Sequence, residues 1–242
     1  MHLSLIIPAH NEEHRLPPTL KAIDAYLDHQ PYASEIVVVE NGSQDLTPVV
    51  AEAFAADHPR VRVLRESGRG KGLAVRRGML EAQGDYRFIC DADLSMPITE
   101  LSKFLPPVLS DYAVAIGSRE APGARRFNEP PYRHVQGRVF SLLVKLFAVP
   151  GFEDTQCGFK CFAAAAARDL FSVQVFNGMS FDVEVLYIAR QRGYKIVEVP
   201  IDWYYRSESR VQPLADPLRM LRDILILRRN WRQGRYAPRP RA

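Results

Sequence analysis

The chain has 242 residues, of which 47% are hydrophobic and 25% are charged. This length allows one large domain with a sizeable core, and the composition excludes a disordered or fibrous protein. The net charge is +4, and no apolar stretch approaches the roughly 18 uncharged residues of a membrane-spanning helix. The first residues lack the basic region and cleavage site of a secretory signal. We therefore expect a cytoplasmic protein.

The first half of the chain alternates between short apolar runs and segments with helical spacing. Four runs of β-branched and apolar residues predict buried strands, at residues 3–7, 35–39, 61–64 and 86–90. The intervening segments predict helices, at residues 17–29, 48–58 and 72–82. Thr47 is the expected N-cap of the second helix. This alternation is typical of an α/β, Rossmann-like fold with a doubly wound, mostly parallel sheet and helices on both faces.

The second half of the chain is less regular. Helices are expected at residues 99–109, 132–147, 163–171 and 182–192. Strands are expected at residues 113–117, 159–162 and 196–199, and the last of these should lie at an edge of the sheet because Pro200 ends it. Residues 120–131 are rich in Pro, Gly and Arg and are expected to form a long loop. A further helix should start at Asp216 and Pro217.

Polar motifs follow the predicted strands, at the sheet edge where such folds bind ligands. Asp91 and Asp93 follow the fourth strand, and two carboxylates suit Mg²⁺ or Mn²⁺ held together with substrate phosphates. The glycine-rich, basic residues 68–72 precede a helix, where a backbone can approach a phosphate closely. They match neither a P-loop, which needs glycine in place of Arg65, nor a dinucleotide fingerprint, which needs glycine in place of Leu73. Each motif alone is also compatible with an ordinary surface turn.

Taken together, the motifs are more specific than any one of them. Those of the first half occupy residues 5–13, 36–43, 70–72 and 91–95, and in this order they resemble the family 2 glycosyltransferases, which have the GT-A fold. The segments that add to the resemblance in the second half are residues 117–119, 154–160, 181–184 and 198–200, and they are similar to the dolichyl-phosphate β-glucosyltransferases and their prokaryotic relatives. The resemblance covers residues 3–231 and implies a metal-dependent, inverting hexosyltransferase with a nucleotide-sugar donor.

The resemblance also implies roles for individual residues. The residues that match nucleotide-binding positions are Pro8, Ala9, Asn11, Glu12, Glu40, Lys71 and Asp91. Asp91 and Asp93 match the pair that holds the metal, Mg²⁺ or Mn²⁺, with the ribose and the diphosphate. Arg119 matches an arginine beside the acceptor phosphate, and Arg133 lies at about the spacing of a second one. The expected catalytic residues are Asp93, Arg119 and Arg133. Glu40 stands where the family usually has an aspartate, which makes the preference for UDP less secure.

The acceptor that the resemblance implies is a dolichyl or polyprenyl phosphate. A phosphate monoester is largely ionised near neutral pH, so it needs positive charge rather than a general base. Arg119, Arg125, Arg126 and Arg133 offer such charge, although a solvated loop is the expected place for Arg125 or Arg126. The resemblance implies that the chain transfers glucose from UDP-glucose to the lipid phosphate with inversion.

Several alternatives to this reaction stay open or are ranked lower. A GDP-mannose-dependent mannosyltransferase acting on the same acceptor is one. A family 2 transferase with a hydroxyl acceptor is another, and it would need a base such as Asp154 or Asp182. A nucleic-acid-binding protein is disfavoured because the basic C-terminus contains no known module. A binder without catalysis is disfavoured because the motif residues are intact, namely Lys71, Asp91, Asp93 and Arg119.

The C-terminal segment is rich in arginine. We divide the chain into a GT-A catalytic domain at residues 1–215 and a basic amphipathic helix and tail at residues 216–242. The apolar residues that could share one face of this helix are Met220, Leu221, Ile224, Leu225, Leu227 and Trp231. Such a helix can lie on an anionic membrane surface or pack on the domain with its arginines in water. With a lipid acceptor, we expect peripheral contact with the cytoplasmic face of a membrane and no nucleic-acid partner.

Overall fold

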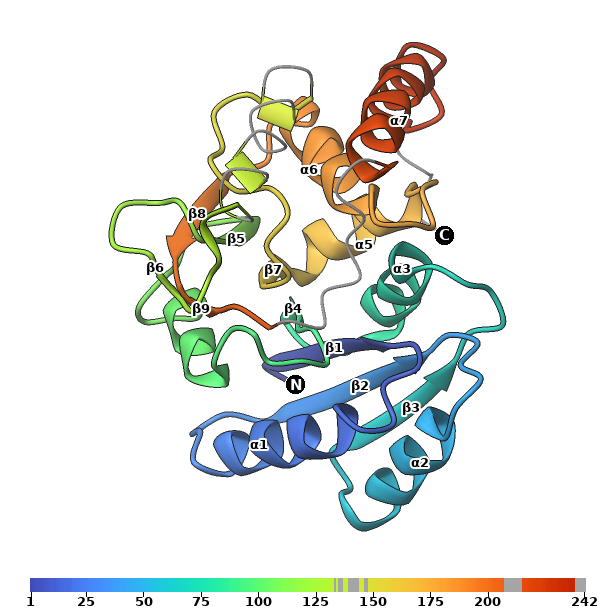
Figure 1. The fold of residues 1–242 in the computed structure, drawn as a ribbon, viewed down its shortest axis with the longest axis vertical. Helices are drawn as coiled ribbons and strands as arrows, with labels where there is room; N and C mark the ends of the chain where they lie inside the picture. Colours follow the sequence, from blue (N-terminus) through green and yellow to red (C-terminus); the bar gives the residue numbers. More distant parts are fainter. Residues whose placement is uncertain (133, 135–136, 139–143, 146–147, 207–214, 238–242) are drawn as a thin grey trace.

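A seven-stranded sheet forms the centre of the computed structural model, which describes the chain except residues 133, 135–136, 139–143, 146–147, 207–214 and 238–242 (Figure 1). Its strands are β1 (Leu3–Ala9), β2 (Ser34–Glu40), β3 (Val61–Arg65), β4 (Tyr86–Ile89), β5 (Val114–Ser118), β7 (Lys160–Ala163) and β8 (Ile196–Pro200). Their order is β3-β2-β1-β4-β7-β5-β8. All neighbours are parallel except β7, which runs antiparallel to both β4 and β5. The predicted mostly parallel sheet, with the last strand at its edge, is therefore confirmed.

Helices cover both faces of the sheet. They are α1 (Leu16–Asp28), α2 (Thr47–Asp57), α3 (Lys71–Glu81), α5 (Ala164–Ser172), α6 (Phe181–Gln191), α7 (Ala215–Arg232) and the 3₁₀ helix η1 (Ile98–Phe104). One hydrophobic cluster joins the sheet to α3, α5, α6 and α7, and the other joins it to α1, α2 and η1 (Figure 1). Successive residues of β1 point into different clusters, Ile6 into the first and Leu5 and Ile7 into the second. Burial on both faces explains why every residue of this strand except Ser4 is apolar.

Most predicted elements lie within one or two residues of the observed ones, but the helix predicted at residues 99–109 is wrong in type and length. The chain there forms η1 and leaves helical geometry before Pro106 and Pro107, because a proline disfavours helical backbone in the residue before it. Thr47 is the first residue of α2 rather than its N-cap, and its hydroxyl donates to Asp45 Oδ1 at 2.6 Å.

The loop predicted at residues 120–131 contains a short strand, β6 (Arg125–Phe127). It pairs in parallel with β9 (Asp202–Tyr204), and the two form a separate two-stranded sheet beside β8 (Figure 1). The helix predicted at residues 132–147 falls partly outside the described residues, and Tyr132, His134 and Val144 within it are helical.

The topology gathers the motif-bearing loops at one edge. Strands β1 to β5 and β8 all run in the same direction, so their carboxyl ends lie side by side. Strand β7 runs the opposite way, so the segment before it, rather than after it, reaches this edge. The segments that meet there are residues 10–13, 41–45, 66–71, 91–95, 119–120 and 154–159.

The C-terminal helix α7 packs on the domain. Met220, Ile224 and Leu227 are buried in the same cluster as α6, whereas Leu225 is 68% exposed. The arginines exposed along its outer face are Arg219, Arg222, Arg228, Arg229 and Arg232. Among the described residues, no helix combines the length and the apolar character that crossing a membrane requires.

Candidate functional site

The loops after β1 and β2 are joined to each other by hydrogen bonds. Asn11 adopts a left-handed backbone with φ of 54°, which asparagine tolerates better than most residues. Its backbone N donates to Ser43 Oγ at 3.0 Å, and its Oδ1 accepts from Gln44 N at 2.8 Å. The backbone N of Glu12 donates to Thr47 Oγ1 at 2.7 Å. Two residues expected to line the nucleotide are therefore held in one rigid pair of loops.

Other residues expected to bind the nucleotide end the two central strands. The β1–β2 register pairs Pro8 with Val39 and Ala9 with Glu40, so these residues lie side by side at the carboxyl edge. The Glu40 side chain is buried, and its Oε1 accepts from Ser43 N at 2.6 Å. The glutamate thus closes the turn that follows its own strand.

Lys71 and Asp91 form an ion pair at this edge. Lys71 Nζ lies 2.5 Å from Asp91 Oδ1, and both side chains are partly exposed. Burial opposes charge on both residues, but their attraction dominates, so it raises the pKa of Lys71 and lowers the pKa of Asp91. The turn that carries Lys71 is fixed beside β2, because Asn41 Nδ2 donates to Gly70 O at 3.2 Å.

Asp93 completes the predicted pair of carboxylates. Its Oδ1 accepts from Ser95 N at 2.9 Å. Among the residues that the structure describes, no three His, Cys, Asp or Glu side chains form a cluster that could hold a metal ion. Asp91 and Asp93 fit Mg²⁺ or Mn²⁺ as hard oxygen donors, with phosphate oxygens and water as the remaining ligands. The site suits a metal that arrives with a nucleotide diphosphate.

A second, fully buried ion pair lies behind the first. Lys160 Nζ is 2.7 Å from Asp182 Oδ1, and it also donates to Cys157 O at 2.5 Å. Burial raises the pKa of Asp182, although Lys160 and Lys71 oppose this effect. The sequence analysis assigned no role to Lys160. A lysine in the otherwise apolar strand β7 could have indicated a buried ion pair, because lysine is rarely buried without a partner. The Asp182 carboxylate is therefore bound in an ion pair with Lys160.

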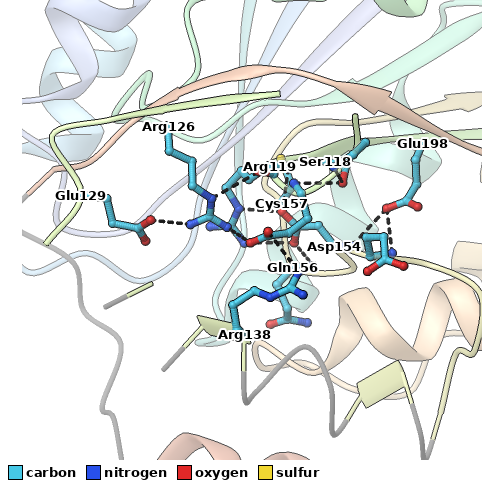
Figure 2. Close-up of polar contacts among 12 residues, drawn as sticks. Ser118, Arg119, Arg126, Glu129, Arg138, Asp154, Gln156, Cys157 and Glu198 are labelled. Carbon is cyan, nitrogen blue, oxygen red and sulfur yellow. Dashed lines mark hydrogen bonds and ion pairs between the residues drawn. The ribbon is translucent and has the colours of Figure 1, made fainter. Parts of the chain in front are cut away.

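Arg119 forms a two-point contact with the buried Asp154. Its Nε donates to Asp154 Oδ2 at 2.6 Å, and its Nη2 donates to Oδ1 at 3.0 Å (Figure 2). Glu198 Oε1 in turn accepts from the backbone N of Glu153 and of Asp154, both at 3.0 Å. The ring of Trp203 lies 5.4 Å from Arg119 Cζ, a cation–π distance. The guanidinium is therefore fixed on two sides.

The other predicted arginines differ in their surroundings. Arg126 donates to Glu129 at 2.6 Å and to Glu120, and is largely buried (Figure 2). Arg125 pairs with Asp202 but stays 69% exposed, as expected for one arginine of this loop. Arg133 lies outside the described residues.

The segment before β7 connects the two halves of the site. At its start, Asp154 holds Arg119. At its end, Gly158 lies against Asp91 so closely that an added Cβ would sit 2.0 Å from Asp91 Oδ2. Residues 154–158 therefore form a strap between the carboxylate and the guanidinium, and we refer to them as the strap below.

Asp154→Asn is expected to destabilise the protein by about 3 kcal/mol at neutral pH, because Arg119 loses its buried partner. Burial raises the pKa of Asp154, but Arg119 more than offsets this and lowers it to about 2 from an ordinary 3.8. Stability from this group is therefore complete above pH 3.8 and is lost as the pH falls through about 2, an effect of about 2 kcal/mol. Urea unfolding from pH 2 to 7 should give a steeper acid loss for the wild type than for the variant. Parallel pH profiles would contradict the assignment.

Comparison with known proteins adds a family relationship. The profile of glycosyl transferase family 2 matches residues 4–172. Dolichyl-phosphate beta-glucosyltransferase of Drosophila melanogaster is 37% identical over 246 residues, which is 94% of this chain and 74% of that protein. The human protein of the same name is 32% identical over 250 residues, covering 97% of this chain and 77% of that protein.

A solved structure shares the fold. The glucosyl-3-phosphoglycerate synthase of Mycobacterium tuberculosis, in complex with Mn²⁺ and UDP-glucose, superposes with a TM-score of 0.66. The match covers 93% of this chain and 77% of that chain at 19% sequence identity, so the likeness concerns the fold alone. That fold is GT-A, as the sequence motifs predicted.

Proposed function

Because the chain belongs to glycosyl transferase family 2 and is a nucleotide-sugar-dependent hexosyltransferase, we propose that it moves glucose from UDP-glucose to dolichyl or another polyprenyl phosphate with inversion. The names of its relatives in fly and human support this acceptor. The observation that carries the proposal is the position of Arg119, which the strap ties to the same sheet edge as Asp91. A fixed guanidinium beside the donor site suits an anionic acceptor.

The two candidate bases argue against a hydroxyl acceptor. Asp154 is bound to Arg119, and Asp182 is bound to Lys160, with both carboxylates buried. A hydroxyl nucleophile normally needs a base that can take its proton, whereas a phosphate monoester carries its charge already. The pairing therefore favours a phosphate as the nucleophile.

The proposed reaction needs one bond to form and one to break. A phosphate oxygen of the acceptor attacks the anomeric carbon, the bond from that carbon to the donor diphosphate breaks, and the diphosphate leaves with the bonding electrons. Arg119 orients the acceptor phosphate, and Lys71 stabilises the negative charge of the leaving diphosphate. Asp91 and Asp93 would hold Mg²⁺ or Mn²⁺, which when bound neutralises the diphosphate.

The nucleotide part of the donor is assigned to the rim formed by β1 and β2. Pro8, Ala9 and Glu40 end these strands, and Asn11 and Glu12 belong to the loop pair that follows. We propose that this rim holds the base and ribose, with uridine as the first choice and guanosine as the second.

The outer face of α7 suits a membrane surface. The exposed arginines surround Leu225, and this combination of basic and apolar groups matches an anionic lipid interface. We propose that the enzyme meets its lipid acceptor by peripheral contact on the cytoplasmic side of a membrane.

The test is a transfer assay with purified protein, a polyprenyl phosphate in anionic vesicles, and a panel of nucleotide sugars. We expect glucosyl lipid from UDP-glucose, loss of activity with EDTA, and recovery with Mn²⁺ or Mg²⁺. Transfer from GDP-mannose alone would overturn the donor and keep the acceptor. Hydrolysis of the donor without any lipid product would overturn the acceptor and point to a hydroxyl nucleophile.

A further inference from the structure

We propose that Glu184 and Tyr236 are positioning residues that brace the donor-binding turn at residues 68–72. Through them, the C-terminal helix α7 and the turn after it support the part of the site that receives the nucleotide. The inference rests on the proposed function only in assigning the turn around Lys71 to the donor.

The first step is the contact between the donor-binding turn and residues 174–180, which precede α6 and which we call the brace segment. The backbone N of Leu73 donates to Asn177 O at 3.1 Å. Gln174 Nε2 donates to Gly72 O at 2.8 Å. Both bonds are made by the two residues that follow Lys71, so the brace segment holds the backbone next to the lysine.

The donor-binding turn and the brace segment are packed too closely to admit a side chain at Gly70 or Gly72. A Cβ on Gly70 would lie 2.2 Å from Asn177 O, and a Cβ on Gly72 would lie 2.6 Å from Phe176 O. Gly70 also has a φ of 132°, which other residues rarely adopt. Since the two backbones touch directly, a displacement of the brace segment must displace the donor-binding turn.

Glu184 holds the brace segment from behind. Its side chain has no exposed surface, and its two oxygens accept from Val175 N at 3.0 Å and from Phe176 N at 2.9 Å. Tyr236, four residues beyond the end of α7, donates its hydroxyl to Glu184 Oε1 at 2.7 Å. Asn230 of α7 donates to the same hydroxyl at 3.3 Å.

A second link joins α7 to the brace segment directly. Ser180 Oγ donates to Asp223 Oδ2, in the middle of α7 (the helix in red in Figure 1). A bond from α7 thus reaches the brace segment directly, and a bond from the turn after α7 reaches it through Glu184. By contrast, Arg119 is fixed by Asp154, which takes its support from Glu198 on β8 rather than from α7. The brace therefore serves the donor side of the site and not the acceptor side.

The test compares two tyrosine variants that each remove one hydroxyl that donates a hydrogen bond. Tyr236→Phe breaks the bond to Glu184, while Tyr112→Phe breaks bonds to Phe104 O and Cys161 at the opposite edge of the sheet. Titration with UDP and Mn²⁺ should give a Kd about three- to tenfold higher for Tyr236→Phe and an unchanged Kd for Tyr112→Phe. Amide exchange should speed up at Leu73 in the first variant only. The KM for lipid phosphate should stay within about twofold in both.

Glu184→Gln serves as the second variant, because glutamine keeps the size of the side chain and loses one of its two acceptor oxygens. It should raise the Kd at least as much as Tyr236→Phe. If both variants lower the melting temperature as Tyr112→Phe does but leave the Kd for UDP and the exchange of Leu73 unchanged, the brace has no positioning role. If the wild type binds GDP rather than UDP, the Kd for GDP is compared among the same variants. The exchange measurement needs no ligand, so a failure of lipid transfer would overturn the proposed function without affecting this result.

Discussion

Gly158→Ala is expected to lower kcat by about 100-fold or more. The added methyl would lie 2.0 Å from Asp91 Oδ2 and 2.7 Å from Asp91 Cγ, so either the strap or the Asp91 side chain must shift. Asp91 cannot turn away freely because its Oδ1 lies 2.5 Å from Lys71 Nζ. A displacement of about 1 Å in a catalytic group costs roughly 100-fold in rate. Steady-state kinetics with UDP-glucose and polyprenyl phosphate measure the effect.

Gly137→Ala is the matched control, since Gly137 is helical and exposed and nothing lies within 4 Å of the Cβ that it would add. Its kcat should stay within about twofold of the wild type, because surface changes away from close contacts cost little. The melting temperature separates a local effect from unfolding: overpacking at Gly158 should cost about 1–3 kcal/mol and leave the protein folded. A folded Gly158→Ala enzyme with full activity would show that Asp91 takes no part in the reaction.

The order of strands and helices was predictable because of how a parallel sheet buries its strands. Strands such as β2 are covered on both faces, and they contain unbroken runs of β-branched residues, which in β2 are residues 36–39. The short strands β6 and β9 have no such signal: each has three residues, and their pairing joins positions 77 apart in the chain. Their stability comes from this distant contact, which local sequence patterns do not contain.

The candidate site was predictable to the extent that sheet topology decides it. Parallel strands bring their carboxyl ends to one edge, and this places Lys71 and Asp91 at the same edge of the sheet without any knowledge of their contacts. The partners of the second half were not predictable. Asp154 and Lys160 reach the site because β7 is inserted antiparallel between β4 and β5, so the segment before the strand arrives at the ligand edge. Strand direction depends on long-range packing, and no local sequence pattern indicates it.

The strongest effect on the acceptor side is expected from Arg119→Lys. Lysine keeps a positive charge beside Asp154, but it lacks the planar fork that binds a carboxylate or phosphate at two points. We expect kcat/KM for polyprenyl phosphate to fall about 100-fold, because a contact between buried charges is lost at the reacting group. The affinity for UDP and Mn²⁺ should be unchanged. Among the described residues, the Arg119 side chain forms its hydrogen bonds with Asp154 and none with the loops after β1 and β2.

Arg125→Lys is the control for this substitution. Arg125 also forms a fork, to Asp202 at 2.9 and 2.6 Å, but its side chain is 69% exposed, and its exposed ion pair contributes little. This variant should keep its kcat/KM within about twofold. Equal losses in the two variants would mean that the loop geometry, and not the Arg119 guanidinium, governs the acceptor. Full activity of Arg119→Lys would place the acceptor phosphate elsewhere and remove the main support for a phosphate nucleophile.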